Sequence, residues 1–232
     1  MPQIKIGGIA LGRQQTRPLI VVPVIEVDNL DNLRGADIAE LRIDMFISQL
    51  VQHVMMGFET FKKKFPGVPV IATCRSKEEG GAAAIAGEDR VAIFTHIIDL
   101  TDAVDIEIKS DIALKIADLA NQHDKTIIAS YHNFSKTPDD KYLEAVYERG
   151  KQTGAHIVKV AVTPNGMDDI RRLTEFQLSH ESVVTISMGA MGMASRIFLP
   201  LVGSLFTFAS LETVTAPGQL SIDEVRRYYQ AF

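Results

Sequence analysis

The residue of this sequence that most directly suggests chemistry is a lysine inside an apolar segment. Lys159 lies within residues 157–162, whose other members are Ile, Val and Ala. Burial in such a strand removes water from the amine and disfavours the charged ammonium. A neutral amine can attack a ketone and form an imine, so Lys159 is a candidate nucleophile. The alternative is a lysine that reaches solvent at a strand end or pairs with Asp or Glu.

A histidine occupies the corresponding place one strand–helix repeat earlier. His132 follows the apolar segment 125–131. An imidazole can take up and return a proton near neutral pH, so it could serve an imine formed on the neighbouring strand. A hydrogen-bonded structural histidine is the alternative. The remaining histidines fall on predicted helices or strand starts, with no spacing typical of a metal site: His53, His96, His123, His156 and His180.

Charged side chains alternate within two further predicted strands. Glu40, Arg42 and Asp44 are two residues apart, and so are Asp105 and Glu107. Because successive side chains of a strand point to opposite faces, each set shares one face. These charges would therefore gather on one side of the sheet.

Two arginines and one glutamate follow strands. Arg75 comes directly after segment 68–74, Glu79 lies in the loop beyond it, and Arg196 follows the seventh predicted strand. An arginine so placed can bind a carboxylate through two parallel N–H donors. A surface ion pair is the alternative for Arg196.

The elements that must position these residues alternate regularly along the chain. Segments rich in Val and Ile, apolar on both faces, predict strands at 19–25, 37–43, 68–74, 103–108, 125–131, 156–162, 183–188 and 204–210. Segments with helical spacing follow them at 28–35, 47–64, 88–100, 111–123, 138–153, 166–179, 192–201 and 222–231. Thr137 followed by Pro138, and Ser221 followed by Glu224, predict two of the helix starts.

Eight strand–helix units in 232 residues predict a closed (β/α)8 TIM barrel. Strands that are apolar on both faces belong in a parallel sheet covered by helices. An open doubly wound sheet is less consistent, because no Gly-rich dinucleotide fingerprint follows the first strand. We expect one domain over residues 1–232, with an extra N-terminal hairpin at 3–13 that covers the bottom of the barrel.

Composition narrows the class of protein. The chain has 46% apolar and 23% charged residues, and 24 Lys and Arg against 29 Asp and Glu give a net charge of −5. This mild acidity argues against a nucleic-acid partner. The longest apolar tract, 197–211, is interrupted and too short for a membrane helix, and the N-terminus lacks a signal peptide. Because Cys74 is the single cysteine, no internal disulfide can form, which favours a reducing, cytoplasmic setting.

An ordered set of motifs extends over nearly the entire chain. These are ELRID (40–44), TCRSKEEGG (73–81), SYHNF (130–134), IVKVAV (157–162), SMG (187–189) with Ser195 and Arg196, and APGQ (216–219). In this order they resemble type I 3-dehydroquinate dehydratase. The resemblance implies a barrel related to class I aldolases, a covalent imine mechanism without metal or organic cofactor, and a homodimer. Its reaction removes water from the small molecule 3-dehydroquinate to give 3-dehydroshikimate, in the shikimate route to aromatic amino acids.

Residue roles carried over from the family rest on the same motifs. Lys159 resembles the lysine that forms the imine, His132 the proton shuttle, and Glu79 the carboxylate that supports the histidine. Substrate contacts are implied for Glu40, Arg42, Arg75, Arg196, Thr215 and Gln219. Within this set, Arg196 resembles the carboxylate clamp, and Gln219 belongs to a loop that covers the substrate.

The sequence departs from the family at two positions. Thr215 stands where many relatives have serine, which keeps the hydroxyl, and Pro23 stands where some have serine, which removes a possible polar contact. Two other functions remain open from the residues: a different imine-forming aldolase of class I, and a catalytically silent barrel that acts as a binding module.

Overall fold

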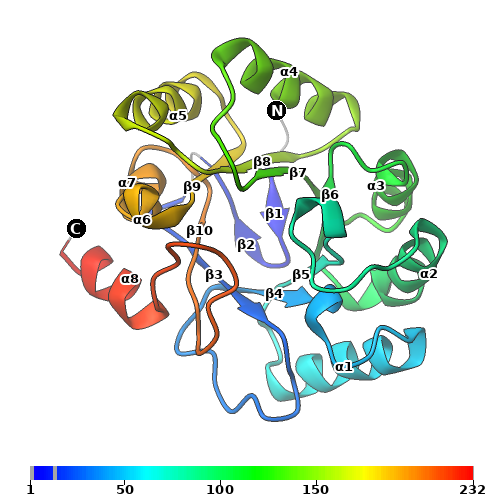
Figure 1. Cartoon of the computed structure of the whole chain (residues 1–232). Coiled ribbons are helices and arrows are strands. Elements are labelled where there is room, and N and C mark those ends of the chain that lie inside the picture. Colours follow the sequence, from blue (N-terminus) through cyan, green and yellow to red (C-terminus); the bar gives the residue numbers. More distant parts are fainter. Residues whose placement is uncertain (1–2, 13–14, 232) are drawn as a thin grey trace.

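The computed structural model describes residues 3–12 and 15–231. Its main sheet consists of β3 (Ile20–Val24), β4 (Ile38–Arg42), β5 (Val70–Thr73), β6 (Ala103–Glu107), β7 (Thr126–Asn133), β8 (Ile157–Val162), β9 (Val183–Ser187) and β10 (Thr207–Phe208). These strands are parallel and pair in chain order, with β10 beside β3. The backbone N–H of Leu205 donates to the Val183 carbonyl at 3.1 Å, which brings β10 to β9 and closes the ring (Figure 1). The predicted (β/α)8 barrel is therefore confirmed.

Helices surround this ring on the outside (Figure 1). They are α1 (Val51–Lys64), α2 (Gly87–Ile97), α3 (Ala113–Gln122), α4 (Asp140–Gln152), α5 (Met167–Ser179), α6 (Gly189–Gly192), α7 (Ser195–Leu201) and α8 (Ile222–Tyr229). Short 3-10 helices form at η1 (Ile43–Met45), η2 (Lys77–Glu79) and η3 (Ile98–Leu100). None of the helices in the described part of the chain has the length and apolar character needed to cross a membrane.

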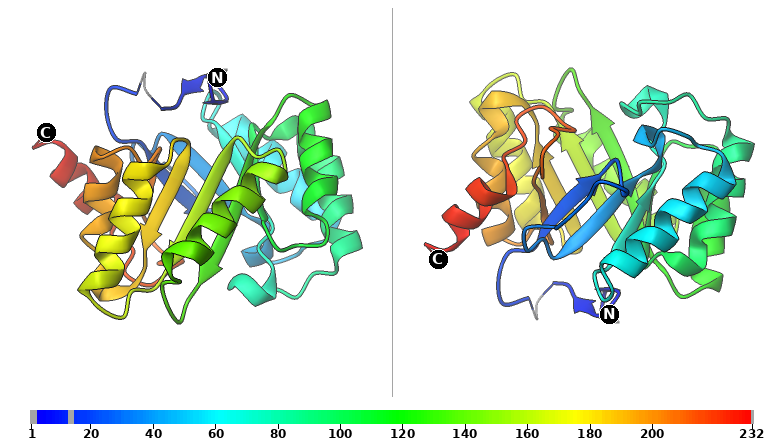
Figure 2. Two further views of the ribbon diagram at one scale, coloured as in Figure 1. Left: turned by 90° about the horizontal axis from the view of Figure 1, so that it is seen from above. Right: turned by 90° about the horizontal axis from the view of Figure 1, so that it is seen from below.

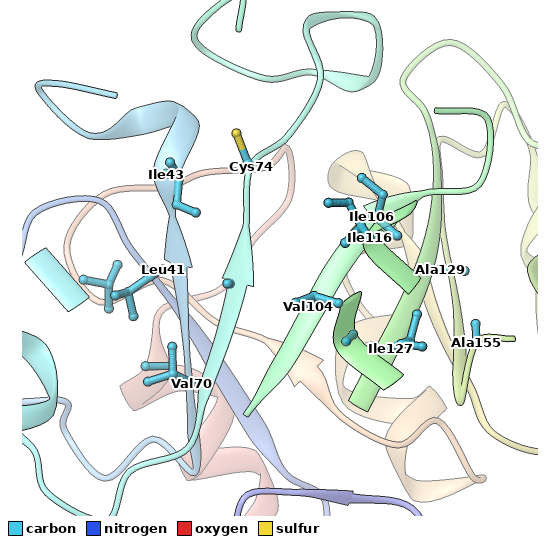
Figure 3. Close-up of a cluster of buried hydrophobic side chains, with 14 of the residues drawn as sticks. Leu41, Ile43, Val70, Cys74, Val104, Ile106, Ile116, Ile127, Ala129 and Ala155 are labelled. Atoms are coloured by element: carbon cyan, nitrogen blue, oxygen red, sulfur yellow. The ribbon is translucent and has the colours of Figure 1, made fainter. Parts of the chain in front are cut away.

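Apolar side chains form two separate layers, one on each face of the barrel sheet. The outer layer lies between strands and helices, where Val104 and Ile106 of β6 share a buried cluster with Ile116 of α3 (Figure 3). The inner layer fills the barrel and includes Ile38 and Ile157. This division follows from the alternation of side chains along each strand, and it explains why the strands are apolar on both faces.

The N-terminal hairpin lies across the amino ends of the barrel strands (Figure 2). Strand β1 (Lys5–Ile6) pairs antiparallel with β2 (Ile9–Ala10). Ile6 is fully buried in the inner apolar cluster, and the Lys5 carbonyl accepts a hydrogen bond from the Thr126 hydroxyl at the start of β7. The predicted hairpin is confirmed, and it covers the end of the barrel opposite the carboxyl ends of the strands.

One predicted helical segment is wrong, and another begins four residues later than expected. Residues 28–35 form turns, in which the Asn32 side chain accepts the backbone N–H of Arg34 at 3.1 Å. Asn and Asp side chains compete with helix formation in this way. Helix α1 begins at Val51 and not at 47, because the Ser48 hydroxyl accepts the Leu50 N–H at 3.3 Å and holds the chain outside the helix. Ile47 is accordingly 94% exposed and is not part of the buried face of α1, which consists of Val54, Phe58 and Phe61.

Of the two helix starts predicted from the sequence, that of α8 is confirmed and that of α4 is displaced. Helix α4 begins two residues later than Thr137 and Pro138 suggested, because the Asp139 carboxylate accepts the Tyr142 N–H at 2.8 Å and acts as the cap. Thr137 instead donates its hydroxyl to the Thr163 carbonyl at 3.1 Å. The capping box of Ser221 and Glu224 at the start of α8 is confirmed.

Candidate active site

A cavity opens at the carboxyl ends of the barrel strands, with an empty volume of about 530 Å³ up to and including its mouth. Seven of its sixteen lining residues lie on strands β4 and β7 to β10, and three more, Arg75, Phe134 and Met188, lie within two residues of the ends of β5, β7 and β9. All nine residues that the family resemblance assigns a role line it: Glu40, Arg42, Arg75, Glu79, His132, Lys159, Arg196, Thr215 and Gln219. The fold thus brings them together from loops and strands that are distant in sequence.

Lys159 points from β8 into the barrel, where its side chain is 5% exposed. Its Nζ donates to Asp105 Oδ2 at 2.9 Å, lies 3.8 Å from Glu40 Oε1, and is 4.3 Å from the centre of the Phe208 ring. The lysine is buried, as the apolar strand predicts, and it also has the acidic partners of the alternative interpretation. The lysine pairs with acids, because β4 and β6 direct their own charged residues into the same space.

Asp105 is the acid in closest contact with that amine. Its other oxygen accepts Arg75 Nη2 at 2.7 Å and the Ser130 hydroxyl at 2.6 Å. Burial opposes ionisation of this carboxyl, but the charges of Arg75 and Lys159 outweigh it and hold the pKa of Asp105 well below its usual value. Asp105 therefore stays a carboxylate. The sequence placed it on the right face but gave it no role.

His132 and Glu79 form a pair beside the lysine. Glu79 Oε2 accepts the backbone N–H of His132 at 2.9 Å and lies 3.0 Å from its Nδ1. Burial, followed by the positive charges of Arg75 and Lys159, holds the pKa of His132 well below its usual value. The imidazole is therefore neutral at pH 7. Because Nδ1 faces Glu79, Nε2 is the nitrogen available to a bound molecule.

A tight turn returns Glu79 to the histidine. The Ser76 carbonyl accepts the N–H of Glu79 at 3.1 Å and that of Gly81 at 2.8 Å. A Cβ on Gly81 would lie 2.1 Å from the Arg75 carbonyl oxygen, so only glycine fits this approach. Burial raises the pKa of Glu79 to about 7. Gly81 of the TCRSKEEGG motif thus allows the turn that places the Glu79 carboxyl beside His132.

Arg42 forms a bidentate pair with Asp44 at the end of β4. Its Nε and Nη2 donate to the two carboxylate oxygens at 3.1 and 2.9 Å. Burial opposes ionisation of Asp44, but the hydrogen bonds from Arg42 prevail and lower the pKa of Asp44. On the same strand, Glu40 accepts the Thr73 hydroxyl at 2.9 Å. The side chains of Arg42 and Glu40 are therefore held in position by the protein itself.

Arg75 is surrounded by protein acceptors. Its Nη1 donates to Glu107 at 3.0 Å and to the Ser130 hydroxyl at 2.7 Å, while Nη2 donates to Asp105. The side chain is only 4% exposed. Its geometry is that of a group that holds Asp105 and Glu107, although it also lines the cavity.

Arg196 differs from the other arginines of the cavity because none of its described contacts is with a carboxylate. Its Nη2 donates to the Pro217 carbonyl at 3.0 Å, and its buried Nε has no hydrogen-bond partner among the described residues. It is 2% exposed, and burial lowers its pKa to about 10. A surface ion pair is therefore excluded. A buried cation without a counter-charge suits an anionic ligand.

The loop between β10 and α8 closes one side of the cavity. Gln219 Oε1 accepts the Thr215 backbone N–H at 2.8 Å and its hydroxyl at 3.1 Å. The Pro217 carbonyl accepts the Gly189 N–H at 3.0 Å, and a Cβ on Gly218 (φ +69°) would lie 2.3 Å from the Gly189 carbonyl oxygen. The glycine of the APGQ motif therefore allows the loop to pack against the end of β9.

One buried charge near the site has no place in the sequence interpretation. Arg90 of α2 is 5% exposed, and its Nη2 donates to Glu107 Oε2 at 2.6 Å. A signal for it exists in the sequence, because Arg90 shares the buried helix face with Ile93, Phe94 and Ile97. An arginine on an apolar stripe needs a buried acid, and Glu107 is that acid.

The other histidines lie away from this cavity, as expected. Two of them, His156 and His180, line a wider groove at the amino ends of the strands. His156 Nδ1 accepts the Ile127 N–H at 3.1 Å, and His180 bonds the Phe176 carbonyl at 2.8 Å. These rings are held by the fold. Across residues 3–12 and 15–231, no three His, Cys, Asp or Glu side chains are grouped as metal ligands would be.

Comparisons with known proteins agree with one another. The family model of type I 3-dehydroquinase matches residues 25–232. A 3-dehydroquinate dehydratase of Thermodesulfovibrio yellowstonii is 38% identical over 217 residues, which cover 91% of this chain and 94% of that protein. The crystal structure of the Geobacillus kaustophilus 3-dehydroquinate dehydratase has a TM-score of 0.90 and 27% identity, covering 99% of this chain and 95% of that one.

A second crystal structure is equally similar. The type I 3-dehydroquinate dehydratase of Clostridium difficile, determined with covalently modified comenic acid, has a TM-score of 0.90 and 26% identity. The match covers 99% of this chain and 97% of that one. Similarity therefore extends over the full barrel.

Proposed function

The chain belongs to the type I 3-dehydroquinase family and has 3-dehydroquinate dehydratase activity in the shikimate pathway, and we propose that it performs this dehydration through an imine on Lys159. The observation that carries the proposal is the meeting of an amine, a neutral imidazole and an unneutralised arginine in one buried cavity. Covalent modification in the Clostridium difficile relative is consistent with a nucleophile in such a cavity.

Imine formation activates the substrate for loss of its proton. The Lys159 amine adds to the ketone carbon of 3-dehydroquinate, and the adduct loses water to give an iminium ion. The iminium withdraws electrons from the adjacent carbon and acidifies its hydrogen. An enamine forms once this proton leaves, with the electron pair held between carbon and nitrogen.

His132 supplies the proton transfers in this proposal. Its neutral Nε2 takes the proton from the carbon next to the iminium, and the imidazolium then protonates the β-hydroxyl, which leaves as water. Glu79 stabilises the imidazolium through its contact with Nδ1 at 3.0 Å. Water finally hydrolyses the product imine, which releases 3-dehydroshikimate and returns the amine of Lys159. The sum of these steps is the loss of one water from the substrate.

Arg196 binds the substrate carboxylate in this proposal. Its guanidinium lacks a carboxylate partner among the described residues, while every other arginine of the cavity has one. Glu40, Arg42, Thr215 and Gln219 supply the polar atoms that contact the substrate hydroxyl groups. Arg75 supports these contacts from below through Asp105 and Glu107.

We also propose that the chain works as a homodimer in the cytoplasm. Helices α7 and α8 expose Phe198 (47%) and Tyr228 (54%), side chains that a second copy could cover. Because Cys74 is the single cysteine, the chain can form no internal disulfide, which is consistent with a reducing compartment. Light scattering of the purified protein at several concentrations tests the dimer, and a mass of one chain throughout contradicts it.

Borohydride reduction in the presence of 3-dehydroquinate tests the mechanism. We expect the mass of one ligand on the peptide that contains Lys159, and loss of both label and activity in Lys159→Ala. Lys62→Ala is the matched control, because Lys62 also pairs with a carboxylate, Asp102 at 2.8 Å, but at the amino ends of the strands. Label on another lysine, or no label in an active enzyme, would overturn the imine proposal.

A further inference from the structure

A continuous series of buried ion pairs runs from helix α2 to the amine of Lys159. We call it the ion-pair chain, and it consists of four contacts. These are Arg90 Nη2 to Glu107 Oε2 (2.6 Å), Glu107 Oε1 to Arg75 Nη1 (3.0 Å), Arg75 Nη2 to Asp105 Oδ1 (2.7 Å) and Asp105 Oδ2 to Lys159 Nζ (2.9 Å). Every side chain in it is at most 6% exposed.

Each carboxylate in the ion-pair chain is shared between two cations. Glu107 divides its two oxygens between Arg90 and Arg75, and Asp105 divides its oxygens between Arg75 and Lys159. Lys159 Nζ also lies 3.8 Å from Glu40 Oε1, so the amine is linked to two carboxylates. Because each carboxylate of the ion-pair chain is shared, a change of charge at Arg90 alters how strongly Glu107, Arg75 and Asp105 attract one another, and through Asp105 it acts on the amine.

Arg90 lies at the remote end of this series and lines no part of the cavity. Its guanidinium is held in place by Glu107, with Ser110 Oγ 3.4 Å from Nη1. If its charge were absent, Arg75 alone would neutralise Glu107. Less of the Arg75 charge would then act on Asp105, and Asp105 would hold the Lys159 ammonium more strongly.

We propose that Arg90 is a positioning residue of the reaction, which acts on Lys159 through the ion-pair chain. This inference rests on the proposed function, because it assumes that Lys159 is the nucleophile. It assigns to helix α2, which contributes nothing to the cavity wall, a part in setting the charge state of the amine. This role would explain why an arginine is buried on the apolar face of α2.

Other charges around the amine also bear on its protonation. The charged and titratable groups that face it are Glu40 on β4, Arg75 after β5, Asp105 on β6 and His132 on β7, and Arg42, Glu79 and Arg196 line the same cavity. All of these groups remain in place in the variants described below. A change in the pH profile therefore reports on the altered member of the ion-pair chain.

The test measures borohydride trapping of 3-dehydroquinate on Lys159 across a series of pH values. Removal of one positive charge favours the ammonium, so the profile of Arg90→Met should shift to higher pH by about half a unit to one unit. This shift corresponds to a roughly 3- to 10-fold loss of trapping rate below the midpoint. Glu107→Gln removes a negative charge and should shift the profile to lower pH.

The net charge of the ion-pair chain is unchanged when the charges of Arg90 and Glu107 are removed together, or when lysine replaces Arg90. The double variant Arg90→Met with Glu107→Gln, and the single variant Arg90→Lys, should both return toward the wild-type profile. A merely structural role of Arg90 would not produce opposite shifts that cancel. Arg17→Met is the matched control, because it also removes one arginine from a carboxylate pair, with Asp37 at the amino ends of the strands, and its profile should not move.

Folded Arg90→Met protein that labels Lys159 with the wild-type pH profile would overturn the role of Arg90. If Arg90→Met does not fold, Glu107→Gln and the double variant decide, and identical profiles in these two variants overturn the role as well. Label on a lysine other than Lys159 in the wild-type protein overturns the proposed function itself. The two failures are thus separate observations.

Discussion

Glu79 lies beside His132 with a carboxylate oxygen 3.0 Å from Nδ1, and burial raises its pKa to about 7. Since this pKa is above that of an unfolded glutamate, the folded protein binds the proton more tightly. The stability gained from this proton is fully present below about pH 4.3 and is lost as the pH rises through about 7. At pH 8 the Glu79 carboxylate is charged in both states, but it is buried only in the folded protein, which makes folding less favourable.

Glu79→Gln should therefore stabilise the protein at pH 8 and leave its stability nearly unchanged at pH 4. We expect a gain of about 1–3 kcal/mol at pH 8, because a neutral amide replaces a buried carboxylate. Activity should fall, since an amide stabilises the imidazolium of His132 less well. Urea unfolding at both pH values, with turnover measured in parallel, checks these outcomes. If Glu79→Gln lowers the free energy of unfolding equally at both pH values, ionisation of Glu79 does not destabilise the folded protein.

Residue types in the site could be predicted, but their partners could not. Lys159 and His132 stand out because polar residues are rare inside apolar strands. The contact of Asp105 with Lys159 depends on the register of three strands, which the sequence of one strand does not contain. For Arg90, the sequence does contain a signal, since the residue shares a helix face with Ile93, Phe94 and Ile97, but an arginine in the first turn of a helix is more often exposed.

At the scale of elements, the strands agree closely with their apolar segments, and the largest departures occur where side chains bond to nearby backbone. Segment 28–35 has helical spacing of apolar residues, yet Asn32 bonds its own turn. Helix α4 has two candidate caps within three residues, and the carboxylate of Asp139 prevails over Thr137. Such local competition is decided by tertiary contacts, as when Thr137 bonds the Thr163 carbonyl, and periodicity does not report it.

Helix α7 and the β10–α8 loop meet at Arg196, whose Nη2 donates to the Pro217 carbonyl at 3.0 Å. Binding of a carboxylate by this guanidinium would therefore also fix the loop that carries Thr215 and Gln219. Arg196→Ala should weaken 3-dehydroquinate binding by roughly 2–5 kcal/mol, and Arg196→Lys by less, because lysine lacks the second parallel donor.

Substrate affinity and thermal midpoint of the same purified Arg196 variants provide the measurement. The midpoint should change little, since Arg196 has no carboxylate partner among the described residues, and the Pro217 carbonyl that loses the Nη2 donor keeps its hydrogen bond from the Gly189 N–H. Unchanged affinity together with a lower midpoint would mean that Arg196 serves the fold and does not bind the substrate.

At the scale of the whole molecule, the residues of the candidate active site lie at one end of the barrel, and the hairpin that contributes to the apolar core lies at the other. The cavity with its charged residues lies at the carboxyl ends of the strands, and the N-terminal hairpin covers the amino ends (Figure 2). Between them, the inner apolar cluster joins Ile6 of the hairpin to residues of the strand interiors such as Ile38 and Ile157. Active sites of this fold occupy the carboxyl end because loops there can vary without changing the apolar interior.

Ile6→Ala should therefore lower the stability of the protein without lowering its catalytic rate. The side chain is fully buried, and removal of its three carbon atoms beyond Cβ should lower the free energy of unfolding by about 2–5 kcal/mol. The turnover number and the Michaelis constant should stay at wild-type values at a temperature where the variant is folded, because Ile6 lies at the end of the barrel opposite Lys159. Ile9→Ala, on the half-buried partner strand of the hairpin, is the matched control and should cost less. Denaturant unfolding and steady-state kinetics on both variants test this prediction. If Ile6→Ala is as stable as the wild type, the hairpin does not belong to the cooperative core. If its turnover number or Michaelis constant changes, whatever its stability, the two ends of the barrel are coupled.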